Sequence, residues 1–404
     1  HAVCSKVLRI ANTSDLTRFE NELDIAIQRL ENAEKALALA TNDGDAQAIA
    51  YAKEAVENAS KEVLTSLENN YESLSEIEQF LAENESKNSE STNAKVAEML
   101  ATQANLENNK PQSALVSRYS NTALSEMSAN VNVALQIARN LDRHLLSQDN
   151  SNVWANTEST KQNYHSDFYR PYKQSLTMTQ IGVANNVNDN VRVGAVLSHS
   201  RANNTFAENV SGKNRLTALS TYVKGNWNNG IFASLDLGYG RSRNTIDFDG
   251  KNNVFHRSLF SAGVNAGIQW DWGVNVQPSI GVRYNRLSKA NYHLAEAKVE
   301  NKALNLMTYR AGLALSKTFD VAGVKLTPSL ASYYNDATQR KMAVNGALSV
   351  NDIGMQQQFG RYFNHEAGLA AQFNQWQVSA QVGMLKGSDI TTQKYAAFKL
   401  GYTW

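Results

Sequence analysis

From about residue 152 to the end of the chain, apolar and polar side chains alternate with a period of two. In the stretch "FSAGVNAGIQW", Phe260, Val264 and Trp270 share one face with alanine and isoleucine, whereas serine, glycine, asparagine and glutamine occupy the other face. The stretches "VNVQPSIGVRY", "MTYRAGLAL" and "FNHEAGLAAQF" repeat the pattern. Successive side chains of a β-strand point to opposite sides of the sheet. The alternation therefore predicts a sheet with one apolar face and one polar face.

About twelve such strands can be delimited from the sequence. They are expected near 152–162, 174–187, 190–201, 214–228, 230–245, 256–271, 273–288, 303–318, 323–336, 360–374, 376–387 and 391–404. Tight turns are predicted at 188–189, 228–230, 271–273, 320–323 and 374–375, and longer polar loops at 163–173, 202–213, 246–255, 289–302, 337–359 and 388–390. Short turns on one rim and long loops on the other are typical of a barrel in a bacterial outer membrane, with the turns periplasmic.

A soluble sandwich of alternating strands is the alternative architecture. It would need large interdigitating core residues on its apolar faces. Here Val, Leu, Ile and Ala dominate the apolar face, and aromatic residues lie near the strand ends. Those beside the short turns are Trp227, Trp270, Phe319, Phe373, Trp376 and Trp404, and those toward the loops are Tyr239, Tyr284, Tyr309, Tyr334 and Phe363. Two aromatic girdles around an aliphatic band indicate a lipid-facing surface.

The polar face is then the lining of the lumen, and it is rich in glycine. The glycines on it are Gly194, Gly238, Gly263, Gly267, Gly281, Gly312, Gly368, Gly383 and Gly401. A lumen lined by small and polar residues can hold an object about as thick as an α-helix, whose diameter is about 10 to 12 Å. The segment 117–146, just before the first strand, has apolar residues at helical spacing and Asn, Ser, Gln and Arg on its other faces. We predict that this helix threads the barrel.

The N-terminal part differs in character, because acidic residues are concentrated there although the 39 basic and 38 acidic side chains of the whole chain nearly balance. Leucines at 16, 23, 30 and 37 recur every seven residues, and a second apolar stripe follows the turn at Gly44. This predicts an acidic helical hairpin over about 14–85, followed by a polar linker. The expected organisation is a stalk or passenger remnant with linker at 1–110, a linker and pore-spanning helix at 111–150, and an outer-membrane barrel at 151–404. The opening "HAVCSKVLRI" does not have the pattern of a signal peptide, so we expect a fragment of a longer precursor.

The sequence gives no indication of cofactor chemistry. One cysteine allows no internal disulfide, and the seven histidines form no pair at metal-ligand spacing. We expect no metal site, no cofactor, no catalytic residue and no nucleic-acid partner. We expect a monomer.

The helix "YSNTALSEMSANVN", followed by about twelve alternating strands and the ending "KLGYTW", resembles the translocator unit of monomeric autotransporters of type V secretion. The likeness covers about 117–404 and is strongest to the IgA-protease-like serine protease autotransporters. In this family the last strand carries a signal for the outer-membrane assembly machinery, which here corresponds to Phe398, Leu400, Tyr402 and Trp404. Lys399 stands where the usual spacing of that signal places glycine.

The resemblance implies a function without catalysis: the barrel delivers its own N-terminal passenger across the outer membrane, and the helix then plugs the pore. Its implied partners are outer-membrane lipid, periplasmic chaperones, the barrel assembly machinery and the passenger, which is expected at the cell surface. The passenger in this group is often a serine protease, but the nucleophile motif "GDSGSP" is absent from this sequence. Some relatives cut themselves at an Asn-Asn pair in the lumenal helix, and this helix contains no such pair.

Polar contacts are expected to hold the helix in the lumen. The residues that we predict to contribute from the helix are Asn121, Asn132, Gln136, Arg139, Asn140 and Arg143, and those from the lumen wall are Arg192, Asp236, Arg283, Arg310, Glu366 and Gln372. The predicted ion pairs join Arg139 or Arg143 to Glu366 or Asp236. Separately solvated charges are the alternative.

Two other functions remain open from the sequence. A passive porin would have the same barrel with an open pore. An outer-membrane hydrolase could use His256 with Asp247 and Asp249, which fall together in one predicted outer loop. No nucleophile accompanies these three residues.

Overall fold

A computed structural model describes residues 13–69, 118–164, 171–295, 297–337, 341–348, 351–358, 360–388 and 390–404. Its helices are α2 (Thr13–Asp43), α3 (Ala46–Asn69) and α6 (Arg118–Leu146). Its long strands are β1 (Val153–Tyr164), β2 (Tyr172–Asn186), β3 (Val191–Phe206), β4 (Val210–Asn226), β5 (Ile231–Phe248), β6 (Lys251–Ile268), β8 (Asn275–Leu287), β11 (Leu304–Ser316), β13 (Val324–Ala337), β16 (Tyr362–Phe373), β17 (Trp376–Gly387) and β18 (Ile390–Tyr402). The short strands are β7 (Trp270–Asp271), β9 (Ala290–Leu294), β10 (Ala297–Asn301), β12 (Phe319–Val321), β14 (Lys341–Leu348) and β15 (Asn351–Gln358).

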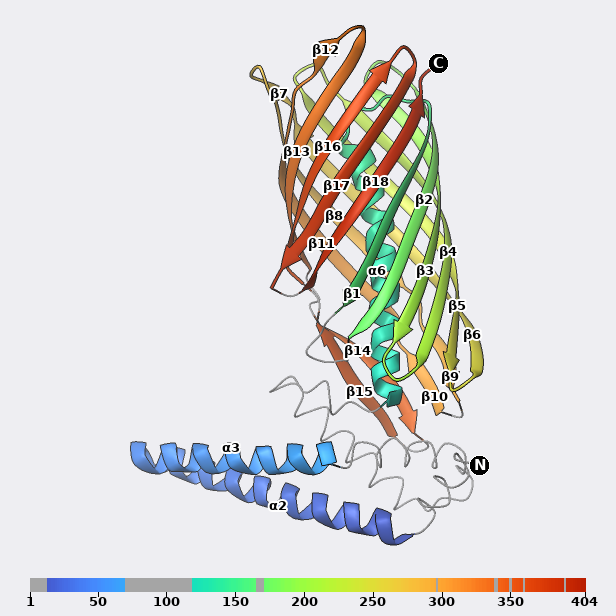
Figure 1. The fold of residues 1–404 in the computed structure, drawn as a ribbon. Helices are drawn as coiled ribbons and strands as arrows, with labels where there is room; N and C mark the ends of the chain where they lie inside the picture. Colours follow the sequence, from blue (N-terminus) through green and yellow to red (C-terminus); the bar gives the residue numbers. More distant parts are fainter. Residues whose placement is uncertain are drawn as a thin grey trace.

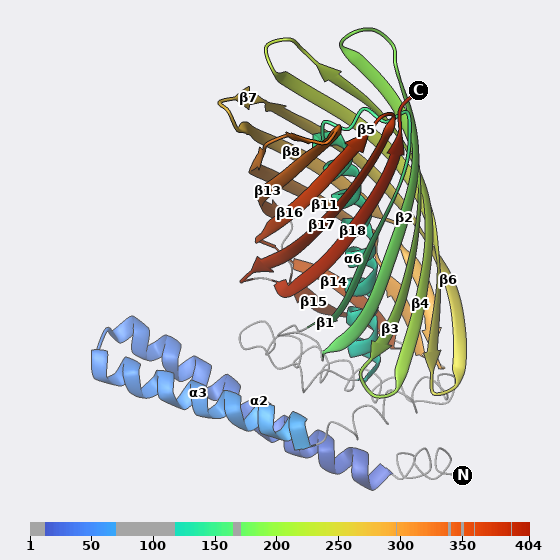
Figure 2. The same ribbon diagram turned by 45° about the horizontal axis from the view of Figure 1, so that its top comes forward.

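The twelve long strands form one closed antiparallel barrel, as the alternation predicts. Each strand pairs with its neighbour in sequence, and β18 returns to pair with β1 from Val153 opposite Tyr402 to Thr160 opposite Tyr395. Figure 1 shows the tilted strands enclosing α6, and Figure 2 shows the same barrel with its upper rim brought forward. Closure leaves no open sheet edge, which is the condition for strands to cross a lipid bilayer.

The tight turns lie where they are predicted. Gly230, Gly273 and Gly323 have φ values of 88°, 82° and 83°, a left-handed region that glycine adopts without steric cost. Asn374 adopts the same region in the turn between β16 and β17. These turns share one rim with the C-terminus and with β7 and β12, at the top of Figure 1.

The prediction of long polar loops on the opposite rim is wrong for four of the six segments. β3 and β4 continue to Phe206 and from Val210, and β5 and β6 are joined at residues 249–250. Segment 289–302 holds the hairpin β9–β10, and segment 337–359 holds β14–β15, and these short strands form a separate four-stranded sheet. In the segment 163–173, residues 165–170 are outside the described residues.

The loop prediction is wrong because the apolar residues move from the outer to the inner face part-way along the strands. In β2 to β6 most apolar residues face outward near the short turns and inward near the opposite rim. The inward set includes Leu176, Met178, Phe206, Val210, Leu216, Ile246, Phe248, Phe255 and Leu259, all buried in one cluster. The wall beyond the apolar band is therefore built like a water-soluble sheet, with its polar residues outside, and polar composition alone suggests a loop there.

The lumenal glycines serve a purpose that the sequence does not reveal. Trp154 lies flat over Gly182, and a Cβ atom at that glycine would lie 2.1 Å from the indole ring. Tyr222 covers Gly194 and Tyr395 covers Gly383 in the same way, each from the neighbouring strand. These glycines make room for aromatic side chains of the wall.

The outer surface has the predicted aliphatic band with an aromatic girdle at each end. Exposed residues beside the short turns are Trp227, Trp270, Trp272, Phe319, Phe373, Trp376 and Trp404, and those beyond the band are Tyr239, Phe260, Tyr309, Tyr334 and Phe363. Leu235, Leu237, Val264, Ile280, Leu330 and Val382 lie between them and are 48% to 64% exposed. Exposure of this much aliphatic surface identifies the band that meets lipid.

The N-terminal hairpin consists of α2 and α3. Gly44, with φ of 75°, forms the turn between them, and Asp45 accepts the backbone N–H of Gln47 at 3.1 Å, which caps α3. No helix in the described part of the chain is long and apolar enough to cross a membrane. The predicted linker and the end of the second apolar stripe lie in 70–117, outside the described residues.

We predict that Leu235→Arg destabilises the barrel by about 2 to 4 kcal/mol, because Leu235 lies midway along the apolar face of β5. The measurement is the free energy of unfolding in denaturant for the protein folded into lipid vesicles. Thr245→Arg is the matched control, since Thr245 lies on the same face of β5 beyond the band, and its cost should stay below about 1 kcal/mol. Equal losses for both variants would contradict the assignment of this face to lipid.

Candidate functional site: the lumenal helix and its wall

Helix α6 runs the length of the barrel interior. Its C-terminal end connects through residues 147–152 to β1 at the rim of the short turns, and its N-terminal end lies beside β14 and β15 at the other rim (Figure 1). Its 29 residues give a length of about 43 Å, close to the full thickness of a bilayer with its headgroups. The helix thus crosses the membrane inside the wall.

The N-terminal half of α6 packs into the apolar cluster. Leu124, Met127 and Val133 are at most 1% exposed and contact the inward side chains of β2 to β6. This half of the lumen is a hydrophobic core, whereas the sequence predicts a polar lumen throughout. Burial of these side chains stabilises the threaded position by roughly 1.5 to 3 kcal/mol each.

A buried ion pair lies within this core. The carboxylate of Glu126 in α6 accepts two hydrogen bonds, of 2.7 and 2.9 Å, from the guanidinium of Arg257 in β6. Both side chains are at most 4% exposed. Asn130, one turn along the helix, donates to Glu126 at 2.5 Å, and its own amide oxygen accepts from Asn214 of β4 at 2.9 Å. Burial and the Glu126 carboxylate raise the pKa of the Tyr292 hydroxyl, which approaches Glu126, well above its usual value.

Neutral hydrogen bonds join the middle of the helix to β2. Asn132 donates to the hydroxyl of Tyr172 at 2.9 Å and to Gln174 at 3.2 Å. Gln174 in turn donates to the carbonyl of Ala129 at 3.1 Å, and Gln136 donates to the backbone of β1. Asn121, also predicted to contribute, is buried near the start of the helix.

Glu158 of β1 is the main acceptor for the next turn of the helix. Its carboxylate is fully buried, accepts from Arg139 at 3.0 Å and is hydrogen-bonded by Asn140. Arg143 approaches the same carboxylate at 3.8 Å.

Arg143 also binds Glu366 of β16 on the far side of the lumen. Three hydrogen bonds of 2.9 to 3.1 Å join the guanidinium to this carboxylate, and Tyr395 donates to it at 2.5 Å. The Arg139 guanidinium lies 4.6 Å from the centre of the Tyr395 ring. The structure thus brings together one of the predicted pairs, Arg143 with Glu366, and gives Arg139 a different partner.

Asp142 forms a fourth charged contact between the helix and the wall. It binds Arg283 of β8 at 2.7 Å and Arg310 of β11 at 3.1 Å, and Asn265 donates to it at 3.1 Å. Asp236, which the sequence analysis pairs with a helix arginine, binds Arg283 instead at 2.8 Å. The predicted pairing of Asp236 with a helix arginine is therefore wrong. Asp236 of β5 meets Arg283 of β8 across Gly263 of β6, which has no side chain to separate them.

The C-terminal end of α6 is fixed by donors from the wall. Gln277 donates to the carbonyl of Leu146 at 2.9 Å, and Lys224 donates to that of Ser147 at 2.8 Å. These are carbonyls that the helix itself leaves without a partner, and a cation beside them also favours the helix dipole. Arg192, a predicted lumen residue, binds the carbonyls of Asn150 and Ser151 in the connection to β1.

Lys399 of β18 points into the lumen at the same level. It binds Asp149 at 2.7 Å and contacts the ring of His144. Burial acts to raise the pKa of Asp149, but the Lys399 ammonium and hydrogen bonds from Ser151 hold it below its usual value. Lys399 thus anchors the connection between α6 and β1 to the last strand.

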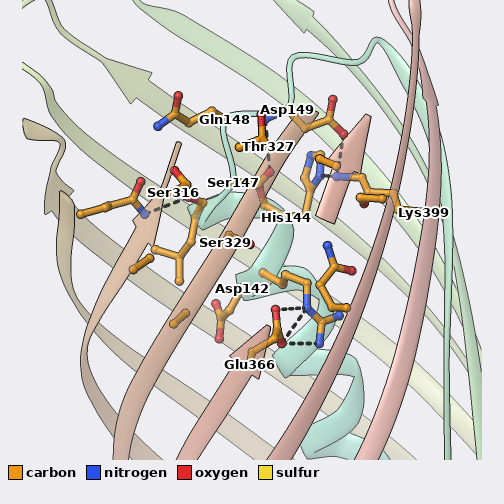
Figure 3. A pocket seen from close by; sticks show the side chains of 18 of the residues that line it. Asp142, His144, Ser147, Gln148, Asp149, Ser316, Thr327, Ser329, Glu366 and Lys399 are labelled. Atoms are coloured by element: carbon orange, nitrogen blue, oxygen red, sulfur yellow. Dashed lines mark hydrogen bonds and ion pairs between the residues drawn. The ribbon is translucent and has the colours of Figure 1, made fainter. Parts of the chain in front are cut away.

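A cavity of about 1030 Å³ lies between α6 and the strands β8, β11, β13, β16, β17 and β18. Figure 3 shows Asp142, Glu366 and Lys399 among its lining residues, together with Ser316, Thr327 and Ser329 of the wall. Gln372 also lines it, near the rim of the short turns, and it is exposed. The helix therefore packs closely against β1 to β6 and is bridged to the other side by the contacts of Asp142 and Arg143.

The residues of the alternative hydrolase site lie on different parts of the hairpin formed by β5 and β6. His256 faces outward opposite Arg243, and Asp247 accepts the backbone N–H of Gly250 in the turn. Within the described residues no group of three or more His, Cys, Asp or Glu is placed to hold a metal ion.

The C-terminal apolar residues predicted to form the assembly signal lie on the outward face of the last strand and just after it. They are Phe398, Leu400, Tyr402 and Trp404. Trp404 donates its backbone N–H to Asn152.

The barrel and its threaded helix define the class: this is an outer-membrane β-barrel whose first strand is continuous with a helix in its own pore. The chain belongs to the autotransporter family, since residues 153–383 match the Autotransporter beta-domain. As a translocator domain of that family it is an outer-membrane protein and is not itself a protease domain.

Curated relatives include two autotransporters of Haemophilus influenzae. The adhesion and penetration protein autotransporter is 36% identical over 295 residues, which cover 72% of this chain and 20% of the relative. The immunoglobulin A1 protease autotransporter is 30% identical over 320 residues, which cover 77% of this chain and 17% of the relative. The chain thus spans about a fifth of the length of these relatives.

Solved structures agree with the fold. The translocator domain of autotransporter NalP from Neisseria meningitidis matches 70% of this chain and 99% of its own, with a TM-score of 0.54 and 14% identity. The β domain of the Bordetella autotransporter BrkA matches 63% of this chain and 100% of its own, with a TM-score of 0.51 and 18% identity.

We predict that Glu158→Gln destabilises the protein by about 3 kcal/mol, because it leaves the buried Arg139 guanidinium without its carboxylate. The measurement is the free energy of unfolding in denaturant. Glu300→Gln is the control: it breaks a 3.0 Å pair with Lys298 in which both side chains are largely exposed, and should cost less than about 1 kcal/mol. A loss for Glu158→Gln as small as that of the control would contradict an anchoring role.

Proposed function

We propose that residues 118–404 deliver the polypeptide that precedes them to the cell surface, and that α6 then closes the pore. One observation carries this proposal: α6 ends at the rim of short turns and begins at the rim of extended hairpins. Short turns are periplasmic in outer-membrane barrels. A chain that continues from the N-terminal end of α6 therefore emerges outside the cell.

The contacts of the helix support its role as a plug. Apolar packing fills the outer half of the lumen, and the pairs of Arg139, Arg143 and Asp142 hold the inner half. The residues predicted from the sequence to form the plug contribute to both halves. An α-helix fixed in this way occupies the lumen, with a cavity beside it.

The precursor that we propose is a secreted serine endopeptidase, in accord with the immunoglobulin A1 protease among the relatives, and its protease would precede the present chain. The acidic segment 1–110 would be a stalk or passenger remnant, 111–150 a linker and plug, and 151–404 the membrane anchor. We propose that periplasmic chaperones and the barrel assembly machinery act on the chain, the latter through the outward residues Phe398, Leu400, Tyr402 and Trp404.

We predict low conductance for the intact chain in a planar lipid bilayer and roughly fivefold or greater conductance after deletion of 118–146, because a pore about as wide as a helix would open. A full-length variant, Glu158→Gln with Glu366→Gln, tests the plug without deletion. It removes the negative charges that pair with Arg139 and Arg143, so its channels should open more often. Glu300→Gln is the control for the conductance of both the deletion variant and the double variant. Channels in the intact chain as large as those of the deletion variant would favour the passive porin.

A further inference from the structure

A row of basic side chains crosses the outer surface of the barrel on four adjacent strands. The strand registers place Arg201 opposite Arg215, Arg215 opposite Arg243, and Arg243 opposite His256. All four side chains face outward; Arg215 is partly exposed and the other three are exposed. Since neighbouring strands lie about 4.8 Å apart, the row is about 15 Å long. We call these four residues the basic row.

Nothing in the described part of the chain neutralises the basic row. No carboxylate there forms an ion pair with any of its members, and Arg215 donates only to the carbonyls of Ala202 and Asn214 and to the amide oxygen of Asn203. Asp247, on the same face of β5, is bound to the turn at Gly250. Like charges directly opposite each other destabilise a sheet. An anion from outside the chain would therefore stabilise this arrangement of three neighbouring guanidinium groups.

The height of the basic row on the barrel indicates which anions can reach it. On β5, Arg241 is ten residues from Ile231, which begins the apolar band, so it lies about 33 Å along the strand and about 25 Å along the membrane normal. This matches the height of the apolar band of outer-membrane barrels, so Arg241 lies at its outer edge, and Arg243, two residues further along β5, lies about 5 Å beyond it. The basic row thus lies at the level of the headgroups of the outer leaflet.

A matching row of apolar side chains lies below the basic row. Four residues nearer the short turns on the same strands, Leu197 faces Leu219, Leu219 faces Tyr239, and Tyr239 faces Phe260. These four side chains are 39% to 58% exposed. A surface with guanidinium groups above and apolar side chains below fits a molecule with an anionic head and acyl chains.

We propose that the basic row and the apolar row beneath it bind a phosphorylated glycolipid of the outer leaflet, with its phosphate groups on Arg201, Arg215 and Arg243. The planar guanidinium forms paired hydrogen bonds with phosphate oxygens, which suits arginine better than lysine to this contact. The acidic hairpin of α2 and α3 offers carboxylates as another anion. It supplies no acyl chains for the apolar row, so the lipid accounts for both rows.

The test is a titration of the full-length protein, folded in a zwitterionic detergent, with fluorescent lipopolysaccharide. We expect Arg201→Gln with Arg243→Gln to weaken binding about 30-fold, from the contribution of each arginine near an anionic lipid surface. Lys161→Gln with Lys386→Gln is the matched control, because it removes two exposed outward cations from β1 and β17, away from the basic row, and should change binding less than threefold. The shift in gel mobility on heating verifies that each variant is folded.

Wild-type protein should also bind dephosphorylated lipid A at least tenfold more weakly than the phosphorylated form. Equal weakening by the two double variants, or equal affinity for the two lipids, would overturn the proposal. Competition by inorganic phosphate at the concentrations of lipid would show a site for free anions and would also overturn it. Cross-links from the basic row to carboxylates of Thr13–Asn69 in lipid particles would assign the row to the acidic hairpin instead.

Discussion

Closure of the sheet by β1 against β18 is the constraint on which the rest of this structure depends. In hydrocarbon every backbone N–H and C=O needs a partner within the protein, and a barrel meets this condition only when its first and last strands pair. Here they pair over eight residues on each side, from Val153 to Thr160. Closure fixes which face of every strand meets lipid. It also creates an enclosed lumen, and the helix that precedes β1 lies within it.

The helix is retained by two different kinds of interaction along its length. Toward the cell surface, Leu124, Met127 and Val133 are part of a hydrophobic core that excludes water. Toward the periplasm the lumen is polar, and the charges of Arg139, Asp142 and Arg143 are each paired with a wall residue. A buried ion pair adds little to stability compared with apolar packing, but the loss of one partner is costly. The pairs therefore favour one position and rotation of the helix over others.

Much of this architecture follows from the sequence, because lipid-facing strands and tight turns have local signatures. The twelve strands, the turns at Gly230, Gly273 and Gly323 and the helix are predicted within a few residues. The sequence predicts loops where the structure has extended hairpins, because polar residues face outward there and the apolar residues move to the inner face. Contacts within the lumen are harder to predict, because they depend on the register between the helix and a distant strand. Glu126, Asp142, Glu158 and Arg257 were missed, although the inward position of Glu158 and Arg257 in the alternation was a signal that each needed a partner.

Amide hydrogen exchange of the full-length protein in lipid tests the threaded helix most directly. A helix of this composition has little stability of its own in water. If α6 is packed inside a closed wall, the amides of Asn121–Leu146 should exchange over hours or longer, like those of the barrel strands. Exchange of these amides within seconds to minutes, while the strands remain protected, would contradict the account.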